Sequence, residues 1–311
     1  MGKIAFVFPG QGAQYVGMGK DFYEQIPACR EVFELASRAS GLDIPGLCFE
    51  ENEKLHITEY TQIAMLTVSA AILRALEEQG VHSQVNAGLS LGEYGALLAS
   101  GVLEMEDAFR VVRQRGILMQ EAVPTGGAMA AVLGLEGGII AKICEKTAGI
   151  VSVANYNCPG QIVITGEEQA VAAASESLKA AGAKRVVPLN VSGPFHSAML
   201  KTAGEKLGKV LEEVEIHEIR TPYLTNVTGD YVADTGQIRQ LLAKQVSSSV
   251  LWQQSVERMI ADGVILFVEI GPGKTLTGFL RKINRSVRGV NIETMEDLEK
   301  AVKIISEETV C

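Results

Sequence analysis

One serine lies in a pattern that is typical of a catalytic nucleophile. Residues Gly88-Leu89-Ser90-Leu91-Gly92 form a G-x-S-x-G motif between a predicted strand over 84–89 and a predicted helix over 91–100. The pattern alone is weakly specific, but so sharp a turn needs glycine at both flanks because the backbones pack closely there. We therefore predict that Ser90 projects over the sheet edge and that the N–H of Leu91 can contribute to an oxyanion hole. An incidental serine in a glycine-rich turn is the alternative.

A serine nucleophile needs a general base, and the chain has four histidines. His56, His82 and His217 lie in polar or charged stretches and are predicted to be solvated surface residues. His196 instead follows Ser192-Gly193-Pro194-Phe195, in a loop at a predicted junction between domains, which is a favoured location for a site. His196 is therefore the candidate base, and a histidine that only caps a helix is the alternative.

An arginine lies on the apolar face of a predicted helix over 104–122. The apolar stripe of this helix consists of Ala108, Val111, Val112, Leu118, Met119 and Ala122. Arg115 falls in the centre of the stripe, whereas Arg110 and Arg113 lie on the opposite side. A buried guanidinium needs an anion, because an unpaired buried charge is strongly unfavourable. The anion is either an internal carboxylate in a salt bridge or a substrate carboxylate held by two parallel hydrogen bonds.

Two glycine-rich stretches resemble nucleotide-binding motifs, but each lacks a required glycine. A dinucleotide fingerprint starting at Gly10 would need glycine at position 15, which is Tyr15. A phosphate-binding loop ending at Lys274 would need glycine at position 268, which is Val268. The first loop remains free to offer the backbone N–H of Gln11. No histidine or cysteine spacing indicates a metal site, and no permanently bound cofactor is expected.

Composition and charge exclude several classes of protein. The chain has 311 residues, of which 47% are hydrophobic and 21% are charged, as in ordinary globular proteins. A net charge of −9 argues against a nucleic-acid-coating protein, and no apolar run approaches the roughly 18 residues of a membrane span. The five cysteines are scattered along the chain and are predicted to be reduced thiols in a cytoplasmic protein.

The order of predicted elements indicates an α/β fold with an insertion. Strands are predicted over 3–8, 84–89, 222–227, 266–270 and 288–292, and helices over 21–39, 59–79, 91–100, 104–122, 236–247, 252–262, 274–284 and the C-terminal segment. This alternation is typical of a mostly parallel sheet. Between them, strands over 127–134, 151–157, 161–166 and 183–190 with helices over 136–148 and 167–181 give the ferredoxin-like order βαββαβ. We predict one domain from residues 1–125 and 192–311, and an inserted subdomain from residues 126–191.

Five motifs in one order resemble a known family. They are Phe8-Pro9-Gly10-Gln11-Gly12, residues 88–94, Gln114-Arg115-Gly116, Pro194-Phe195-His196-Ser197 and Glu269-Ile270-Gly271-Pro272-Gly273. Over residues 3–290 the chain resembles the malonyl-CoA:acyl carrier protein transacylases of bacterial fatty acid synthesis. The resemblance implies an α/β-hydrolase-like core with a ferredoxin-like insertion, which agrees with the order of elements.

The resemblance also implies a mechanism for the chemistry-bearing residues. Ser90 is the acylated nucleophile and His196 its base, while the backbone N–H groups of Gln11 and Leu91 form the oxyanion hole. The imidazole is oriented by a backbone carbonyl rather than by an aspartate. The reaction is ping-pong: the malonyl group passes from malonyl-CoA to the serine, and then to the phosphopantetheine thiol of an acyl carrier protein.

Further positions of the pocket follow from the same resemblance. Arg115 binds the free carboxylate of the malonyl group, and Phe195 is the malonyl-selective form of its position. Gln245 matches a residue near the active site whose neighbourhood supports the histidine. Many members carry histidine directly before the serine, where this chain has Leu89, so any contribution of that side chain is absent.

The expected partners are malonyl-CoA and acyl carrier protein, with no nucleic acid and no membrane. The acidic carrier protein needs a local basic surface, for which the cluster at 281–288 and the pair Lys184-Arg185 are candidates. Two alternatives stay open. A serine esterase or thioesterase on the same fold would share Ser90 and His196 but would not need Arg115, and a carrier-protein docking module without catalysis would form no acyl-serine.

Overall fold

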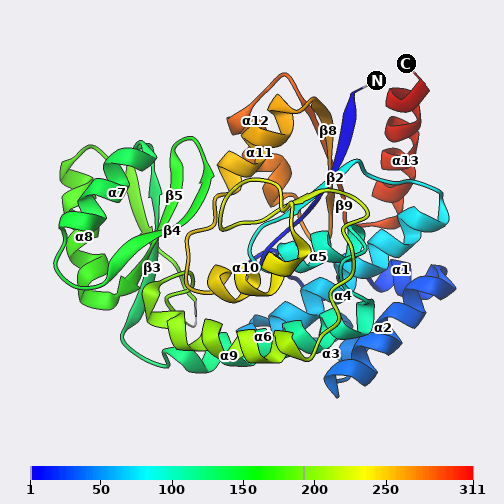
Figure 1. Cartoon of the computed structure of the whole chain (residues 1–311), viewed down its shortest axis with the longest axis horizontal. Coiled ribbons are helices and arrows are strands. Elements are labelled where there is room, and N and C mark those ends of the chain that lie inside the picture. Colours follow the sequence, from blue (N-terminus) through cyan, green and yellow to red (C-terminus); the bar gives the residue numbers. More distant parts are fainter. Residues whose placement is uncertain (1, 192, 311) are drawn as a thin grey trace.

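The computed structural model describes residues 2–191 and 193–310. Figure 1 shows a larger body and a smaller body that comes from the middle of the chain. Ser192, at the predicted domain boundary, and Cys311 lie outside the described residues. The predicted domain limits therefore stay a prediction.

The larger body is built on a parallel five-stranded sheet in the order β7-β2-β1-β8-β9. Its strands are β1 (Lys3–Phe8), β2 (Val85–Gly88), β7 (Tyr223–Leu224), β8 (Val264–Ile270) and β9 (Arg288–Ile292). The central strand β1 is buried on both faces. Ile4, Phe6 and Phe8 join one apolar cluster, while Ala5 and Val7 join another on the opposite face. This double burial explains why β1 is an uninterrupted apolar run.

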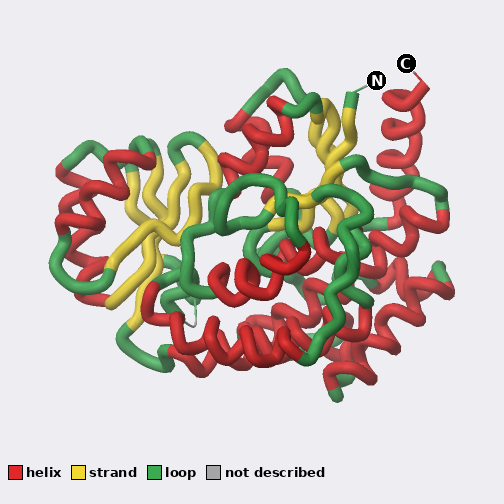
Figure 2. Tube along the Cα trace, viewed as in Figure 1, coloured by secondary structure: helices red, strands yellow, loops and turns green. Residues whose placement is uncertain are grey.

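Helices cover both faces of this sheet (Figure 2). They are α1 (Lys20–Gln25), α2 (Pro27–Ser40), α3 (Ile44–Phe49), α4 (Thr58–Glu78), α5 (Gly92–Ala99), α6 (Met105–Ala122), α9 (Lys201–Glu212), α10 (Ile238–Gln245), α11 (Trp252–Ala261), α12 (Thr275–Ile283) and α13 (Met295–Val310). Short 3₁₀ turns occur at Lys54–His56, Ala198–Leu200 and Thr235–Gln237. Within the described part of the chain, no helix combines the length and the apolar character that a bilayer crossing requires.

The smaller body is a four-stranded antiparallel sheet in the order β4-β5-β3-β6. Its strands are β3 (Gly127–Leu133), β4 (Val151–Cys158), β5 (Gln161–Glu167) and β6 (Arg185–Pro188), and α7 (Gly137–Lys146) and α8 (Glu168–Ala180) pack on it (Figure 1). The first and third strands of the unit form the central pair, which is the ferredoxin-like arrangement. The predicted α/β class, with a parallel sheet and a separate βαββαβ unit, is confirmed.

The structure differs from the predicted elements at several points. The single helix predicted over 21–39 is wrong, because Ile26 is extended and Pro27 starts a second helix. Proline has no N–H for the helical ladder and disfavours helical geometry in the preceding residue. The strand predicted over 222–227 pairs over Tyr223–Leu224 only. The helices α3 and α9 were not predicted.

Candidate active site

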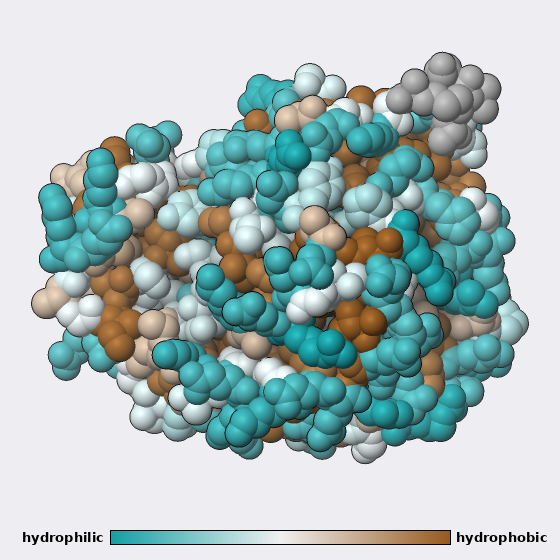
Figure 3. Space-filling view, viewed as in Figure 1, coloured by the Kyte–Doolittle hydropathy of each residue, from teal (hydrophilic) through white to brown (hydrophobic). Residues whose placement is uncertain are grey.

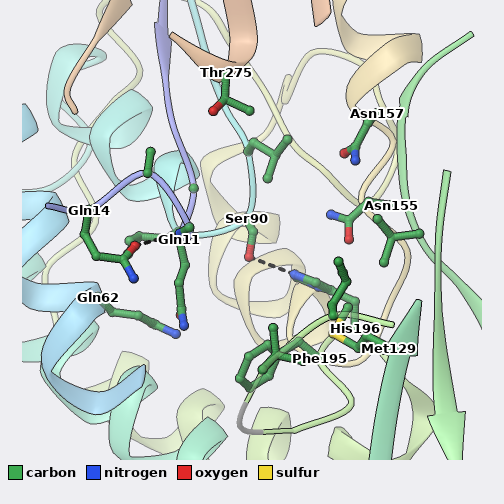
Figure 4. Close-up of a pocket in the computed structure, with 18 of the residues that line it drawn as sticks. Gln11, Gln14, Gln62, Ser90, Met129, Asn155, Asn157, Phe195, His196 and Thr275 are labelled. Carbon is green, nitrogen blue, oxygen red and sulfur yellow. Dashed lines mark hydrogen bonds between the residues drawn. The ribbon is translucent and has the colours of Figure 1, made fainter. Parts of the chain in front are cut away.

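Ser90 lies in the turn between β2 and α5, at the carboxyl edge of the parallel sheet. Its φ of 54° is in the left-handed region that non-glycine residues rarely adopt. A Cβ atom on Gly88 would overlap the carbonyl of Gly92, and one on Gly92 would overlap the carbonyl of Phe8. The turn therefore accepts only glycine at both flanks, as predicted, and it presents the Ser90 side chain to a pocket (Figure 4).

His196 lies beside Ser90, 106 positions away in the sequence, with Nε2 2.7 Å from Ser90 Oγ (Figure 4). Its Nδ1 is 2.9 Å from the backbone carbonyl oxygen of Gln245. Because a carbonyl only accepts hydrogen bonds, Nδ1 carries the proton and Nε2 is left to accept the serine proton. Burial, together with the Arg115 guanidinium, lowers the pKa of His196 to about 4. The imidazole is therefore neutral at pH 7, the state that a general base requires.

Arg115 on α6 is 1% exposed, as the apolar stripe predicted. Its guanidinium donates from NH1 to Gln62 Oε1 at 2.6 Å, and from NH2 to Gln245 Oε1 at 2.9 Å and Ser90 Oγ at 3.1 Å. Among the described residues it forms no salt bridge, and its Nε has no hydrogen-bond partner. The alternative of an internal salt bridge is therefore wrong, and neutral acceptors hold the buried cation beside Ser90.

Asn226 holds the Ser90 turn from the loop that follows the neighbouring strand β7. Its side chain accepts from the N–H of Ser90 at 2.6 Å and donates to the carbonyl of Gly88 at 2.6 Å. Gln245 Nε2 also donates to the Ser90 carbonyl at 3.0 Å. Both backbone groups of the strained serine are thus fixed by side chains.

Sequence reasoning missed Asn226, Gln62 and the buried Glu93 of the same network. One signal could have found Asn226, since it lies two residues after the end of β7 and the carboxyl ends of neighbouring parallel strands meet at one edge of the sheet.

The pocket above Ser90 has a volume of about 580 Å³ and lies between the two bodies. Gln11 and Gln62 line one side, and Asn155 and Asn157 of β4 line the other (Figure 4). Among the described residues, the N–H groups of Gln11 and Leu91 donate to no protein acceptor. They are available to a ligand oxygen near Ser90, as an oxyanion hole requires.

Apolar residues gather in patches on the mostly hydrophilic face in Figure 3.

The remaining predicted positions also have a clear place. Phe195 and Leu89 line the pocket, and Gln245 is fully buried behind Ser90. His56 is exposed as predicted but contributes to the pocket wall, which was not predicted. Within the described residues, no group of three histidine, cysteine or acidic side chains could hold a metal ion.

The comparison with known proteins agrees with this arrangement. The chain belongs to the acyl transferase domain family, whose pattern matches residues 5–303. It is similar to the malonyl CoA-acyl carrier protein transacylase of Bacillus subtilis (strain 168), with 44% identity over 313 residues that cover 99% of both chains. The resemblance predicted from five ordered motifs is thereby confirmed.

Solved structures give the same result. The malonyl CoA-acyl carrier protein transacylase of Clostridium perfringens is 46% identical, with a TM-score of 0.96 over 99% of this chain and 98% of that chain. A malonyl-transacylase in complex with a type II PKS acyl-carrier protein is 40% identical, with a TM-score of 0.94 over 97% of this chain and 99% of that chain.

Proposed function

We propose that this protein is an acyltransferase of fatty acid biosynthesis. It moves a malonyl group from malonyl-CoA to the phosphopantetheine thiol of acyl carrier protein, through a malonyl ester of Ser90. The observation that carries the proposal is the buried guanidinium of Arg115, which lies 3.1 Å from the nucleophile and forms no salt bridge among the described residues. A site for an acyl group that bears its own carboxylate explains this cation, whereas a site for neutral esters does not.

In the first half-reaction Ser90 Oγ attacks the thioester carbonyl of malonyl-CoA. Nε2 of His196 takes the serine proton, and the N–H groups of Gln11 and Leu91 stabilise the negative charge on the carbonyl oxygen. The carbon–sulfur bond then breaks, and the His196 imidazolium returns the proton to the departing CoA thiolate. The carbonyl of Gln245, at 2.9 Å from Nδ1, orients the ring and stabilises the transient imidazolium.

Arg115 selects the acyl group. One methylene separates the free carboxylate of a malonyl group from its ester carbonyl, so the carboxylate of malonyl-Ser90 lies within reach of this guanidinium. The unpaired Nε and the NH2 group offer it two donors. Phe195, which is 7% exposed at the pocket wall, limits the space beside the acyl group.

In the second half-reaction the phosphopantetheine thiol of the carrier protein attacks the malonyl ester. His196 takes the thiol proton as the bond forms and gives it to Ser90 Oγ as the ester bond breaks. A backbone carbonyl rather than a carboxylate orients His196 in this cycle, so Ser90 and His196 act as a dyad. No permanently bound cofactor takes part in the proposed cycle.

The proposal includes a cytoplasmic location, where thiols remain reduced. The cysteines at 29, 48, 144 and 158 are buried and free, which supports this location.

A two-stage loading experiment tests the proposal. The protein is incubated with malonyl-CoA, separated from free nucleotide, and then mixed with holo acyl carrier protein. We expect malonyl-enzyme after the first stage and malonyl carrier protein after the second, with neither product formed by Ser90→Ala. Release of malonate to water instead would identify a hydrolase. Absence of any acyl-enzyme would leave only a docking module.

A further inference from the structure

A buried carboxylate lies behind the candidate site and takes no part in the steps above. Glu93 is in the first turn of α5, three residues after Ser90, and is fully buried. It lines no part of the pocket and, among the described residues, forms no salt bridge. A buried carboxyl group loses its hydrogen bonds to water, so hydrogen bonds from the protein must replace them.

One oxygen of this carboxylate makes two hydrogen bonds. Glu93 Oε2 accepts from the side-chain Nε2 of Gln245 at 2.7 Å and from the backbone N–H of Asn226 at 3.0 Å. Both donors belong to residues that contact Ser90 directly. The carboxylate therefore links the two groups that hold the nucleophile.

The orientation of the Gln245 amide follows from the groups around its two ends. Burial raises the pKa of Glu93, but its Oε2 already accepts from the backbone N–H of Asn226 and so serves as an acceptor. The NH₂ end of the amide therefore faces Glu93 Oε2, at 2.7 Å, and it also donates to the Ser90 carbonyl at 3.0 Å. A guanidinium only donates, so the oxygen end faces Arg115, at 2.9 Å from NH2. We propose that Glu93 is a positioning residue, which fixes the Gln245 amide so that its oxygen holds Arg115 in place for the malonyl carboxylate. This inference rests on the proposed function.

The general base and the N–H of the nucleophile have separate supports. His196 is held by the backbone carbonyl of Gln245, which does not depend on how the side-chain amide is turned. The N–H of Ser90 is held by Asn226 Oδ1. Without the acceptor at position 93 the amide loses the shortest hydrogen bond of its Nε2 and keeps the longer ones to Ser90 and Asn226, so its oxygen holds the Arg115 guanidinium less firmly. The preference for malonyl over acetyl groups should then fall more than the ability to acylate the serine.

The test compares the rates of acyl-enzyme formation from malonyl-CoA and from acetyl-CoA by intact-protein mass. Glu93→Met and Gln245→Met are each expected to reduce the malonyl preference by about tenfold, the effect of a lost hydrogen bond to a charged group. The malonyl preference of the double variant should fall no further than that of either single variant, because both changes remove the same support of Arg115 by the Gln245 oxygen. Glu93→Gln keeps an acceptor oxygen and should retain the preference within about threefold.

The matched control is Thr165→Val, a change of similar size at a buried position of β5 that removes no hydrogen bond of Glu93 or Gln245. It should leave the malonyl preference unchanged. Where Glu93→Met does not fold, Glu93→Asp replaces it with the same expected loss, since the shorter side chain withdraws the acceptor.

Three results would overturn the proposal. The first is a loss of malonyl preference in the double variant that equals the product of the two single losses. The second is an equal loss of the acylation rates with malonyl-CoA and acetyl-CoA. The third is a Glu93→Gln variant with the same loss of preference as Glu93→Met. A wild-type protein that forms no malonyl-enzyme would refute the proposed function, which separates that failure from a failure of the role of Glu93.

Discussion

Replacing Arg115 by alanine should sharply reduce the preference of the site for malonyl over acetyl groups. The guanidinium is buried beside Ser90 Oγ, so a malonyl carboxylate bound there is shielded from water. A hydrogen bond to a charged group contributes about 1.5–3 kcal/mol. A bidentate pair of hydrogen bonds would double this contribution. However, the hydrogen bonds of Arg115 to Gln62 and Gln245 must be shared or exchanged when the carboxylate binds.

We therefore expect a net loss of about 2–4 kcal/mol in binding the malonyl transition state, which is about 30-fold to 1,000-fold in kcat/KM. Acetyl-CoA has no carboxylate for the guanidinium, so its rate should change by less than about threefold. Arg113→Ala is the control, because this residue lies on the same helix and pairs with Glu59 at 3.0 Å outside the pocket.

The assay is a single-turnover measurement of acyl-enzyme formation, with each thioester, on variants whose circular dichroism matches the wild type. A lower malonyl rate with an unchanged acetyl rate is the expected pattern. Equal losses with both thioesters would refute the reasoning, since Arg115 would then support the fold or the nucleophile rather than the carboxylate. An Arg113→Ala variant as impaired as Arg115→Ala would refute it as well.

Three other predictions concern pH, packing and charge. Since the pKa of His196 is lowered to about 4 from about 6.5 in the unfolded chain, its contribution to stability is complete above pH 6.5 and is lost as the pH falls. Denaturant titration should show about 2–3 kcal/mol less stability from this source at pH 4.5 than at pH 7, a difference that His196→Gln removes. Gly88→Ala should destabilise the protein by more than about 2 kcal/mol in thermal unfolding, whereas Gly278→Ala, in open space on α12, should be neutral or stabilising by up to about 1 kcal/mol. Arg285→Glu, in the exposed cluster after α12, should slow transfer to the acyl carrier protein in a coupled assay without changing acylation by malonyl-CoA.

Each of these predictions has a contrary outcome. A His196→Gln protein with the wild-type pH slope would mean that other groups carry the acid sensitivity. A stable Gly88→Ala protein would show that the turn relaxes around the added methyl group. Unchanged transfer by Arg285→Glu would remove the 281–288 cluster as a docking surface and leave Lys184-Arg185 to be tested in the same way.

Local patterns were enough to predict the main elements and three candidate site residues. The burial of Arg115 follows from helical periodicity, which placed one cation inside an apolar stripe. The close packing at Gly88 and Gly92 follows from the geometry of a strand-to-helix turn. The candidate base could be selected because histidines are few in this sequence.

The residues that support the site could not be predicted in this way. Asn226 contacts Ser90 across 136 positions and Gln245 contacts it across 155, so no local spacing relates them. Gln62 lies in α4, a helix that is buried over most of its surface, where periodicity does not separate a functional side from a packed side. The charge of Glu93 was visible in the sequence, but the acceptor-only role of one oxygen appears only when the chain is folded.

The central claim is that Ser90 carries the malonyl group. The most direct measurement is proteolytic mapping of the protein after brief exposure to malonyl-CoA, with the modified residue located by tandem mass spectrometry. We expect one malonyl group, on the peptide that contains Ser90, and its loss when holo acyl carrier protein is added. A malonyl group on any other residue, or an unmodified protein that still transfers malonyl to the carrier, would contradict it.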